Sequence, residues 1–340
     1  MIALLDRLIW ASISGGIAAL FVILLCRVPS IDPRWKVWLC RACYVKLLVS
    51  MLSGFAIGVP LLGSGKAGDG TVASSPALFW LAAWLASIWI VGIAVVVRHV
   101  WQSIKFARKC GERAIPVDET LRREVYRMAA RMGVRRVPEL GESALLGQPC
   151  VFWFHRPTLL VPDGFEVEEG RHVLAHELAH IGHRDLLWGR LYAVVSALYW
   201  FHPLVSRLER EARLWQEASA DLAARRTTRV DPREQADAIV TALALLNHRE
   251  RNNVVALGQY GSMDTVMRRI RALYSERYSP VLALAVLALG LVAMAPLRLV
   301  AKETLGKRTP GIATRMRIVD GHDRVTRGAA PVELYSPRLQ

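Results

Sequence analysis

The chain has 340 residues, of which 53% are hydrophobic and 21% charged, and it carries a formal net charge of +15. Several long stretches hold no charged residue, so the composition predicts a membrane protein. The excess of Lys and Arg is assigned to loops beside the membrane and to helices that face anionic lipid. Direct nucleic-acid binding is not expected, because no basic segment with interleaved aromatic residues stands out. The five Cys, three of them in or beside apolar stretches, indicate reduced thiols, and a disulfide framework is not expected.

Four apolar stretches predict membrane-spanning helices. Leu8–Cys26, Thr71–Val97 and Tyr278–Leu297 contain no charged side chain and reach the about 18–20 residues that a span requires. Ala42–Leu62 predicts another span, in which Lys46 can extend its ammonium group toward the lipid headgroups. The first stretch is interpreted as a retained span rather than a cleaved signal peptide, since it ends without a small-residue cleavage pattern. The spans are placed at about residues 8–26, 42–62, 77–97 and 278–297.

The Lys and Arg residues of the short loops predict the orientation, because positive residues are retained on the cytoplasmic side. Cations gather between the first two spans and again after the third, whereas the loop around residues 63–75 has only Lys66. The long segment from about residue 98 to 277 is therefore expected to be cytoplasmic. The cations counted are Arg27, Arg34, Lys36, Arg41 and Lys46 in the first group, and Arg98, Lys105, Arg108, Lys109 and Arg113 in the second.

The segment after the third span, about 180 residues, is long enough to form a domain with its own core. It begins with a basic amphipathic helix near residues 118–132, whose Arg-rich face is expected to meet solvent or lipid. Glu166, Glu168 and Glu169 suit the positive end of a helix that continues to about Gly182. Leu191–Val205 is apolar but too short to span, so it is expected to be a buried or membrane-grazing helix. Strands are predicted at residues 137–140, 151–154 and 158–161.

The stretch His176–His180 reads His-Glu-Leu-Ala-His, the HExxH arrangement of zinc peptidases. Residues four apart project from one face of a helix, so His176 and His180 can bind one tetrahedral Zn²⁺ while Glu177 reaches a water on it. His172 and His183 lie three or four residues away and are interpreted as surface or supporting histidines. A catalytic zinc takes three protein ligands and keeps one position open, so a third ligand is required.

The third ligand is expected at Glu217, in a helical pattern where Asp221 lies one turn further along the same face. Glu217 can complete the metal site, and Asp221 can accept a hydrogen bond from the far nitrogen of a ligating His. The alternative is that both carboxylates only decorate an Arg-rich helix. The residues between His180 and Glu217 leave room for a helix out, a turn at Phe201-His202-Pro203, and a helix back.

The chain resembles the BlaR/MecR-type membrane metallopeptidases, metallopeptidase family 56, from the first span to about Leu297. The resemblance rests on segments around the two helices named above. These segments are Val173-Leu174-Ala175 before HExxH, Arg184-Asp185-Leu186 after it, Trp200–Leu204 before the Glu217 helix, the strand pair with Arg156–Pro162, and the helix with Arg269-Ile270. The resemblance implies that His176, His180 and Glu217 are the metal ligands, and that the peptidase domain is cytoplasmic.

The expected fold is a mainly α membrane protein with four transmembrane helices and a cytoplasmic gluzincin-like α+β zinc peptidase domain between the third and fourth spans. The expected parts are a three-span membrane region at residues 1–100, the peptidase domain at 101–277, the fourth span at 278–297, and a short extracytoplasmic tail at 298–340. Family members that sense β-lactams carry a penicillin-binding domain after the fourth span. Here only about 43 residues follow Leu297 and the chain has no SxxK sequence, so acylation of that kind is not expected.

The function implied is zinc-assisted hydrolysis of a peptide bond in signal transduction at the cell membrane, with Glu177 as general base. The expected partners are the lipid bilayer, a cytoplasmic protein substrate such as a transcriptional repressor, and a second copy of the chain. A peptide substrate is expected along the strands between Val151 and Val161. Tyr199, His202 and Arg213 are weighed as oxyanion-stabilising residues. Two alternatives stay open: a quality-control or processing protease of the membrane, and an inactive zinc-bound receptor or scaffold.

Overall fold

The computed structural model describes residues 2–53, 57–61, 76–153, 155–250, 263–275, 278–279 and 297–301, together with residues 285, 288 and 290. In this part of the chain the fold is mainly helical and includes two small sheets. The helices are α1 (Ile2–Cys26), α2 (Pro33–Ser53), α3 (Pro76–Glu112), α4 (Glu119–Arg131), α5 (Val167–Gly182), α6 (Asp185–Leu198), α7 (Pro203–Thr228), α8 (Pro232–Glu250) and α9 (Met263–Tyr274). The strands are β1 (Ile57–Leu61), β2 (Glu139–Glu142), β3 (Cys150–Trp153), β4 (Pro157–Val161) and β5 (Leu297–Ala301).

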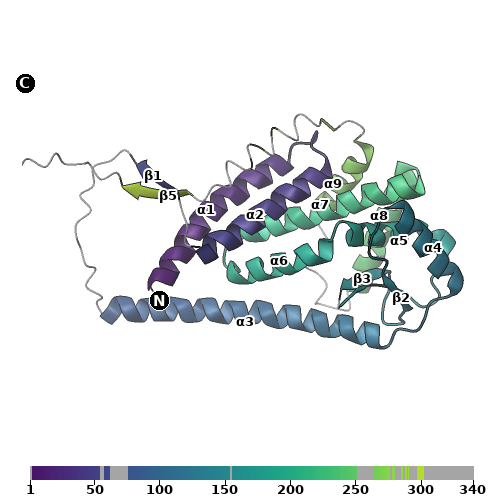
Figure 1. The fold of residues 1–340 in the computed structure, drawn as a ribbon, viewed down its shortest axis with the longest axis horizontal. Helices are drawn as coiled ribbons and strands as arrows, with labels where there is room; N and C mark the ends of the chain where they lie inside the picture. The colour runs from purple at the N-terminus through teal and green to yellow at the C-terminus, as the bar shows by residue number, and fades with distance from the viewer. Residues whose placement is uncertain are drawn as a thin grey trace, which may run out of the picture.

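Helices α1, α2 and α7 run side by side, and α6 lies between them and α3 (Figure 1). Their buried side chains form one apolar cluster that includes Tyr44 of α2, Tyr192 of α6, and Tyr199 just after α6. Burial of apolar area is the main force that holds such helices together, at about 25 cal/mol per Å² removed from water. The cluster joins the N-terminal helices to those that follow HExxH, so packing does not separate these two parts of the chain.

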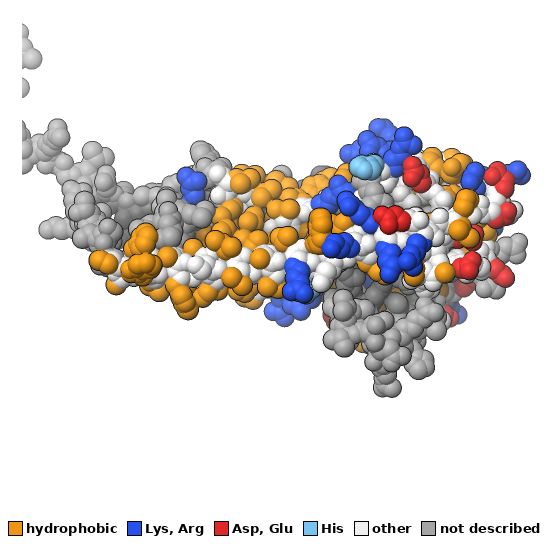
Figure 2. Space-filling model, turned by 90° about the horizontal axis from the view of Figure 1, so that it is seen from below, with side chains coloured by type: hydrophobic (Ala, Val, Ile, Leu, Met, Phe, Trp, Pro, Cys, Tyr) orange, Lys and Arg blue, Asp and Glu red, His pale blue; other side chains and the backbone are white. Residues whose placement is uncertain are grey.

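Helix α3 exposes a long apolar surface. Its 37 residues are equivalent to about 55 Å of helix, more than the about 30 Å of a bilayer core. Figure 2 shows hydrophobic side chains over most of the face that α3 presents, while Lys and Arg gather toward one end. Within the described residues two helical stretches are long and apolar enough to cross a membrane, Arg7–Cys26 and Phe79–Glu112. Large exposed side chains on α3 include Trp80, Trp84, Ile90, Val91 and Trp101.

The second predicted span, at residues 42–62, is wrong in its boundaries. Helix α2 begins nine residues earlier, where Pro33 fits the first helical position and the Asp32 carboxylate accepts a hydrogen bond from the Arg34 N–H at 2.8 Å. It ends at Ser53, and Ile57–Leu61 forms strand β1 instead of continuing the helix.

The cations of α2 are buried, which the loop-charge interpretation did not anticipate. Lys36, Arg41 and Lys46 expose only 2%, 4% and 7% of their surface. Lys36 lies over the ring of Trp215, 3.7 Å from its centroid, and the Lys46 ammonium donates to the Ser14 hydroxyl at 3.1 Å. Lys46 therefore packs against α1 and does not extend toward headgroups. Three of the five cations counted before the second span are packing residues rather than loop charges.

The apolar segment at residues 191–205 is divided between two helices that form a hairpin. Helix α6 ends at Leu198 and α7 begins at Pro203, with the turn expected around Phe201-His202-Pro203 between them. The turn contacts α3, where the Trp89 indole donates to the Leu198 carbonyl at 2.8 Å. It also contacts α1, where a His202 ring nitrogen lies 3.2 Å from the Ser12 carbonyl. The hairpin tip thus touches both apolar helices near their middles.

The three-stranded sheet has the order β2-β4-β3, with β2 parallel and β3 antiparallel to β4. The first strand begins two residues later than predicted, after Pro138, which cannot donate to a ladder. A second apolar cluster packs α4 and β4 against α5, with Leu121, Val125, Leu159, Leu174 and Leu178 among its members. The Arg-rich face of α4 is exposed, as predicted from its periodicity. This cluster fixes the orientation of α5, which carries HExxH.

The C-terminal predictions fall largely outside the described residues. Of the fourth span at 278–297, the structure describes residues 278, 279, 285, 288, 290 and 297. Of the tail at 298–340, it describes residues 298–301, which belong to β5 and pair in parallel with β1. This pairing joins segments more than 200 residues apart in the chain, in the register Ile57 to Leu297 through Leu61 to Ala301.

Candidate metal centre

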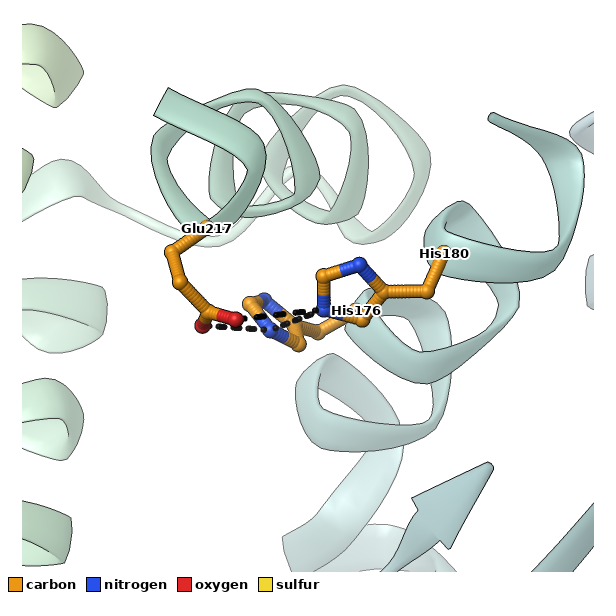
Figure 3. Close-up of side chains that lie close together, drawn as sticks. All are labelled: His176, His180 and Glu217. Atoms are coloured by element: carbon orange, nitrogen blue, oxygen red, sulfur yellow. Dashed lines mark hydrogen bonds and ion pairs between the residues drawn. The ribbon is translucent and has the colours of Figure 1, made fainter. Parts of the chain in front are cut away.

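Helices α5 and α7 pack against each other and bring the predicted ligands together. His176 and His180 project from α5, and Glu217 projects toward them from α7 (Figure 3). The opposite face of α5 carries Leu174 and Leu178, which are fully buried against α4 and the sheet. Helical periodicity therefore separates a core face from a ligand face on α5.

The distances among the three side chains match those of a tetrahedral metal site. The two Nε2 atoms of His176 and His180 are 3.1 Å apart, and the Glu217 carboxylate lies 3.3 Å from the first and 3.6 Å from the second. Ligand atoms about 2.0–2.1 Å from a tetrahedral zinc lie about 3.3–3.4 Å from one another. One ligand atom from each residue falls within 4.8 Å of the others. The residues present therefore fit a Zn²⁺ ion.

A carboxylate and an arginine support His176 from behind. The His176 Nδ1–H donates to Asp221, with 3.0 Å between Nδ1 and Oδ1, which leaves the Nε2 lone pair free to face the metal position. Asp221, 2% exposed, also accepts two hydrogen bonds from Arg269 of α9, each 2.9 Å long. Another Arg269 nitrogen lies 3.4 Å from Glu217. Asp221 thus contacts a candidate ligand, the contact on which its predicted supporting role depends, whereas Arg269 was not predicted to reach the site.

His180 has an equivalent support that the sequence interpretation missed. Its Nδ1 lies 2.7 Å from Asp185, the first residue of α6, and Asp185 pairs with buried Arg41 at 2.5 Å. Gln216 also donates to Asp185, at 3.3 Å. Asp185 reaches His180 because Arg184, with φ of 57°, adopts the left-handed conformation and reverses the chain just after α5. The sequence signal that could have predicted this support is an Asp five residues after His180.

The carboxylates change the pKa values of the two histidines. Burial lowers the pKa of His176, but its hydrogen bonds to Asp221 and Glu217 outweigh burial and raise the pKa to about 10. Burial also opposes a charged His180, yet the hydrogen bond to Asp185 gives a net increase in its pKa. The pKa of Glu217 is lowered, since His176 and other cations overcome the effect of burial. The site is thus a cluster of anionic groups around two basic imidazoles, suited to a divalent cation.

Glu177 lies beside the cluster and next to the sheet. Burial raises the pKa of its carboxyl, while His180 and His176 act in the opposite direction, as does a hydrogen bond from the Val151 backbone. A carboxylate with a raised pKa accepts a proton more readily near neutral pH. Val151 belongs to β3, an edge strand of the three-stranded sheet among the described residues. Glu177 therefore stands between the metal position and a sheet edge.

The residues weighed for oxyanion stabilisation have partners elsewhere. The Tyr199 hydroxyl donates to the Leu47 carbonyl at 3.1 Å, and His202 contacts Ser12 of α1. Arg213 pairs with Glu209 at 2.7 Å on the same helix. All three positions pack or pair away from the His176–Glu217 cluster. His172 is half-buried, and burial lowers its pKa and that of His183, in keeping with neutral supporting histidines.

A family model described as BlaR1 peptidase M56 matches residues 67–273, more than half of the chain. This chain belongs to the BlaR1 peptidase M56 family. The matched range contains both cluster helices, Asp185 and Arg269, so the family resemblance and the metal-site geometry concern the same residues. Arg41, which completes the support of His180, lies before the matched range.

A curated relative gives a second similarity. Regulatory protein BlaR1 of Bacillus licheniformis is 28% identical over 145 residues, 42% of this chain and 24% of that protein. The chain thus aligns with about a quarter of the length of this relative. Membership of the M56 family implies a metallopeptidase, and the cluster of His176, His180 and Glu217 is compatible with that class.

Proposed function

We propose that this chain is a membrane-embedded zinc endopeptidase that acts in signal transduction by cleaving a cytoplasmic protein, such as a transcriptional repressor. The observation that carries the proposal is the convergence of His176, His180 and Glu217 at tetrahedral spacing, with Glu177 beside them. Three protein ligands with a base nearby are typical of catalytic rather than structural zinc sites. This argues against an inactive scaffold, in which Glu177 would have no role.

The chemistry is divided between the metal and the chain. Bound zinc would lower the pKa of its water from 15.7 toward about 7 and polarise the scissile carbonyl. Glu177 would accept the proton of the attacking water at its carboxylate and deliver it to the leaving amine. Asp221 and Asp185 would hold the imidazoles in the tautomer whose Nε2 is unprotonated.

The substrate is proposed to bind as an added strand along β3. Glu177 is close to the Val151 backbone, so a peptide paired with β3 would place its scissile bond near both the base and the metal. The Trp153 carbonyl at the end of β3 accepts a hydrogen bond from Arg190 at 2.7 Å, which limits the open edge on that side. An extended and locally unfolded segment of the substrate would fit this edge.

The membrane location is supported by α1, α3 and the α6–α7 hairpin. Exposed apolar side chains cover α3, and the hairpin tip contacts the middles of α1 and α3. Cations follow the apolar part of α3, which favours a cytoplasmic peptidase domain. The curated relative is named a regulatory protein, which favours a signalling role for this chain over general quality control.

A comparison of cleavage products in cells tests the function. Wild-type protein and the Glu177→Gln variant would be expressed at equal levels, zinc content would be measured in both, and protein termini would be mapped across the proteome. The proposal predicts that the variant keeps its zinc and that a discrete fragment of a regulatory protein disappears. Many lost fragments from unrelated membrane proteins would support the quality-control alternative. An unchanged set of termini with zinc retained would contradict an enzymatic role.

A further inference from the structure

A cavity of about 650 Å³ opens on the far side of α5 from Glu177. Leu178, Ala179 and Gly182 of α5 and His183 just after it line the cavity, together with residues of α2 and α7. Successive helical residues are about 100° apart, so the mean direction of these four positions around the helix axis is roughly opposite to Glu177. The cavity is therefore separate from the side of α5 on which a peptide would reach the base, and its size is within the about 300–1,000 Å³ of ligand pockets.

The lining of this cavity is strongly cationic. Four arginines and one aspartate contribute a net charge of +3, and the arginines come from three different parts of the chain. Arg34 and Arg226 are exposed and form no ion pair within the described residues, so their charges are available to a ligand. The charged lining residues are Arg34, Arg41, Arg184, Arg226 and Asp185.

The Arg41 side chain is held in a fixed position in the cavity wall. Its guanidinium carbon lies 5.0 Å from the ring centroids of both Trp38 and Trp188, so two indoles fix its position. One terminal nitrogen is used by Asp185 and the His183 carbonyl. Its Nε is buried and has no hydrogen-bond partner among the described residues. The guanidinium therefore places one fixed positive charge in the wall of the cavity.

We propose that this cavity binds a phosphate-bearing anion, supplied either by the headgroup of an anionic phospholipid or by a soluble phosphate. Arginine guanidinium groups present paired donors that match phosphate oxygens, and several of them converge here. Trp38 is half exposed beside the cavity, and indoles of this kind suit the headgroup level of a bilayer. The cavity adjoins the metal centre through Asp185, which both lines it and contacts His180.

The test compares three versions of the full chain purified in detergent. These are the wild type, the Arg34→Gln/Arg226→Gln variant, and the Arg108→Gln/Arg113→Gln control, which removes two exposed charges that do not line the cavity. Binding of phosphatidylglycerol would be measured by native mass spectrometry, and binding of inorganic phosphate by calorimetry. The cavity variant is expected to bind the anion about tenfold more weakly than wild type and control, because it loses two charge-assisted contacts.

The pattern across probes identifies the source of the phosphate. Retained phosphatidylglycerol that inorganic phosphate does not displace supports a lipid headgroup, and displacement by inorganic phosphate supports a soluble anion. Equal binding of both probes by all three proteins would overturn the proposal. If the double variant fails to fold, the single Arg34→Gln and Arg226→Gln variants give the same comparison, each with a smaller expected loss.

Discussion

The two histidines of the candidate metal centre are supported by different regions of the molecule. His176 is held by Asp221 and, through it, by Arg269 of α9, which makes two hydrogen bonds to the carboxylate. His180 is held by Asp185 and, through it, by Arg41 of α2, which makes one contact and stacks between two indoles. The α9 side is joined by polar pairing, and the α2 side by burial among aromatic rings. A shift of α9 would therefore act on His176 through Asp221, and a shift of α2 would act on His180 through Asp185.

Loss of Glu217 would remove the group that faces both histidines. Its carboxylate lies 3.3 Å from His176 Nε2 and 3.6 Å from His180 Nε2. The Glu217→Ala variant is expected to lose more than about a hundredfold in zinc affinity, beyond the effect of a supporting residue. Competition with a fluorescent chelator measures this, with exposed Glu119→Ala as control. Zinc affinity equal to that of the control would show that Glu217 is not a ligand.

Substitution of Asp221 or Asp185 tests the support of each histidine separately. Asp221→Asn and Asp185→Asn are each expected to weaken zinc binding by about 10–100-fold, because an amide does not hold the required tautomer as a carboxylate does. Asp221→Asn should cost more, since Asp221 is 2% exposed and leaves Arg269 with a lost partner. The same chelator competition applies, with exposed Asp163→Asn as control. A larger loss for Asp185→Asn would reverse the ranking of the two sides.

The pH dependence of zinc binding tests both histidines, since the pKa of each is raised in the metal-free protein. Since the pKa of His176 is raised to about 10 without metal, zinc must displace a proton below that pH. Zinc affinity is therefore expected to rise by up to about tenfold per unit between pH 7 and 10. The stability that the protonated His176 gives the metal-free protein is complete below pH 6.5 and is lost as pH rises toward 10. A zinc affinity that does not change between pH 7 and 10 would contradict the assignment of His176 as a metal ligand.

The two arginines are expected to have the smallest effects. Arg269→Lys cannot keep both hydrogen bonds to Asp221, so zinc affinity should fall by roughly fivefold, about 1 kcal/mol. Arg41→Lys keeps a charge near Asp185 but loses the stacking on Trp38 and Trp188, so its main expected effect is a lower melting temperature. Thermal unfolding and chelator competition on both variants separate the two results. If both variants lost zinc affinity and melting temperature to the same extent, the supports of His176 and His180 would be equivalent.

Local spacing was enough to predict which helices carry the candidate ligands and which side chains share a face. His176 and His180 lie one helical turn apart, as do Glu217 and Asp221, and such pairs share a face in any helix. The order of the helices and strands around them followed from the same kind of pattern. The amphipathic helix α4 formed within one residue of its predicted ends, since its apolar period fits one buried face.

The supports from α2 and α9 could not be predicted, because they depend on contacts between residues far apart in the chain. Arg41 lies 144 residues from Asp185, and Arg269 lies 48 residues from Asp221. From the sequence alone, Arg41, Lys36 and Lys46 are counted among the cations between the first two predicted membrane spans. Their burial follows from helix packing among α1, α2 and α7, which composition does not reveal.

X-ray absorption spectroscopy of the zinc-loaded full chain tests the metal centre most directly. The account predicts one zinc per chain with about four nitrogen or oxygen neighbours at about 2.0–2.1 Å, and scattering from two imidazoles. The Glu217→Ala variant should change this first shell while the imidazole signal stays. Sulfur neighbours at about 2.3 Å, or fewer than two imidazoles in the wild type, would contradict the assignment of His176, His180 and Glu217 as the metal ligands.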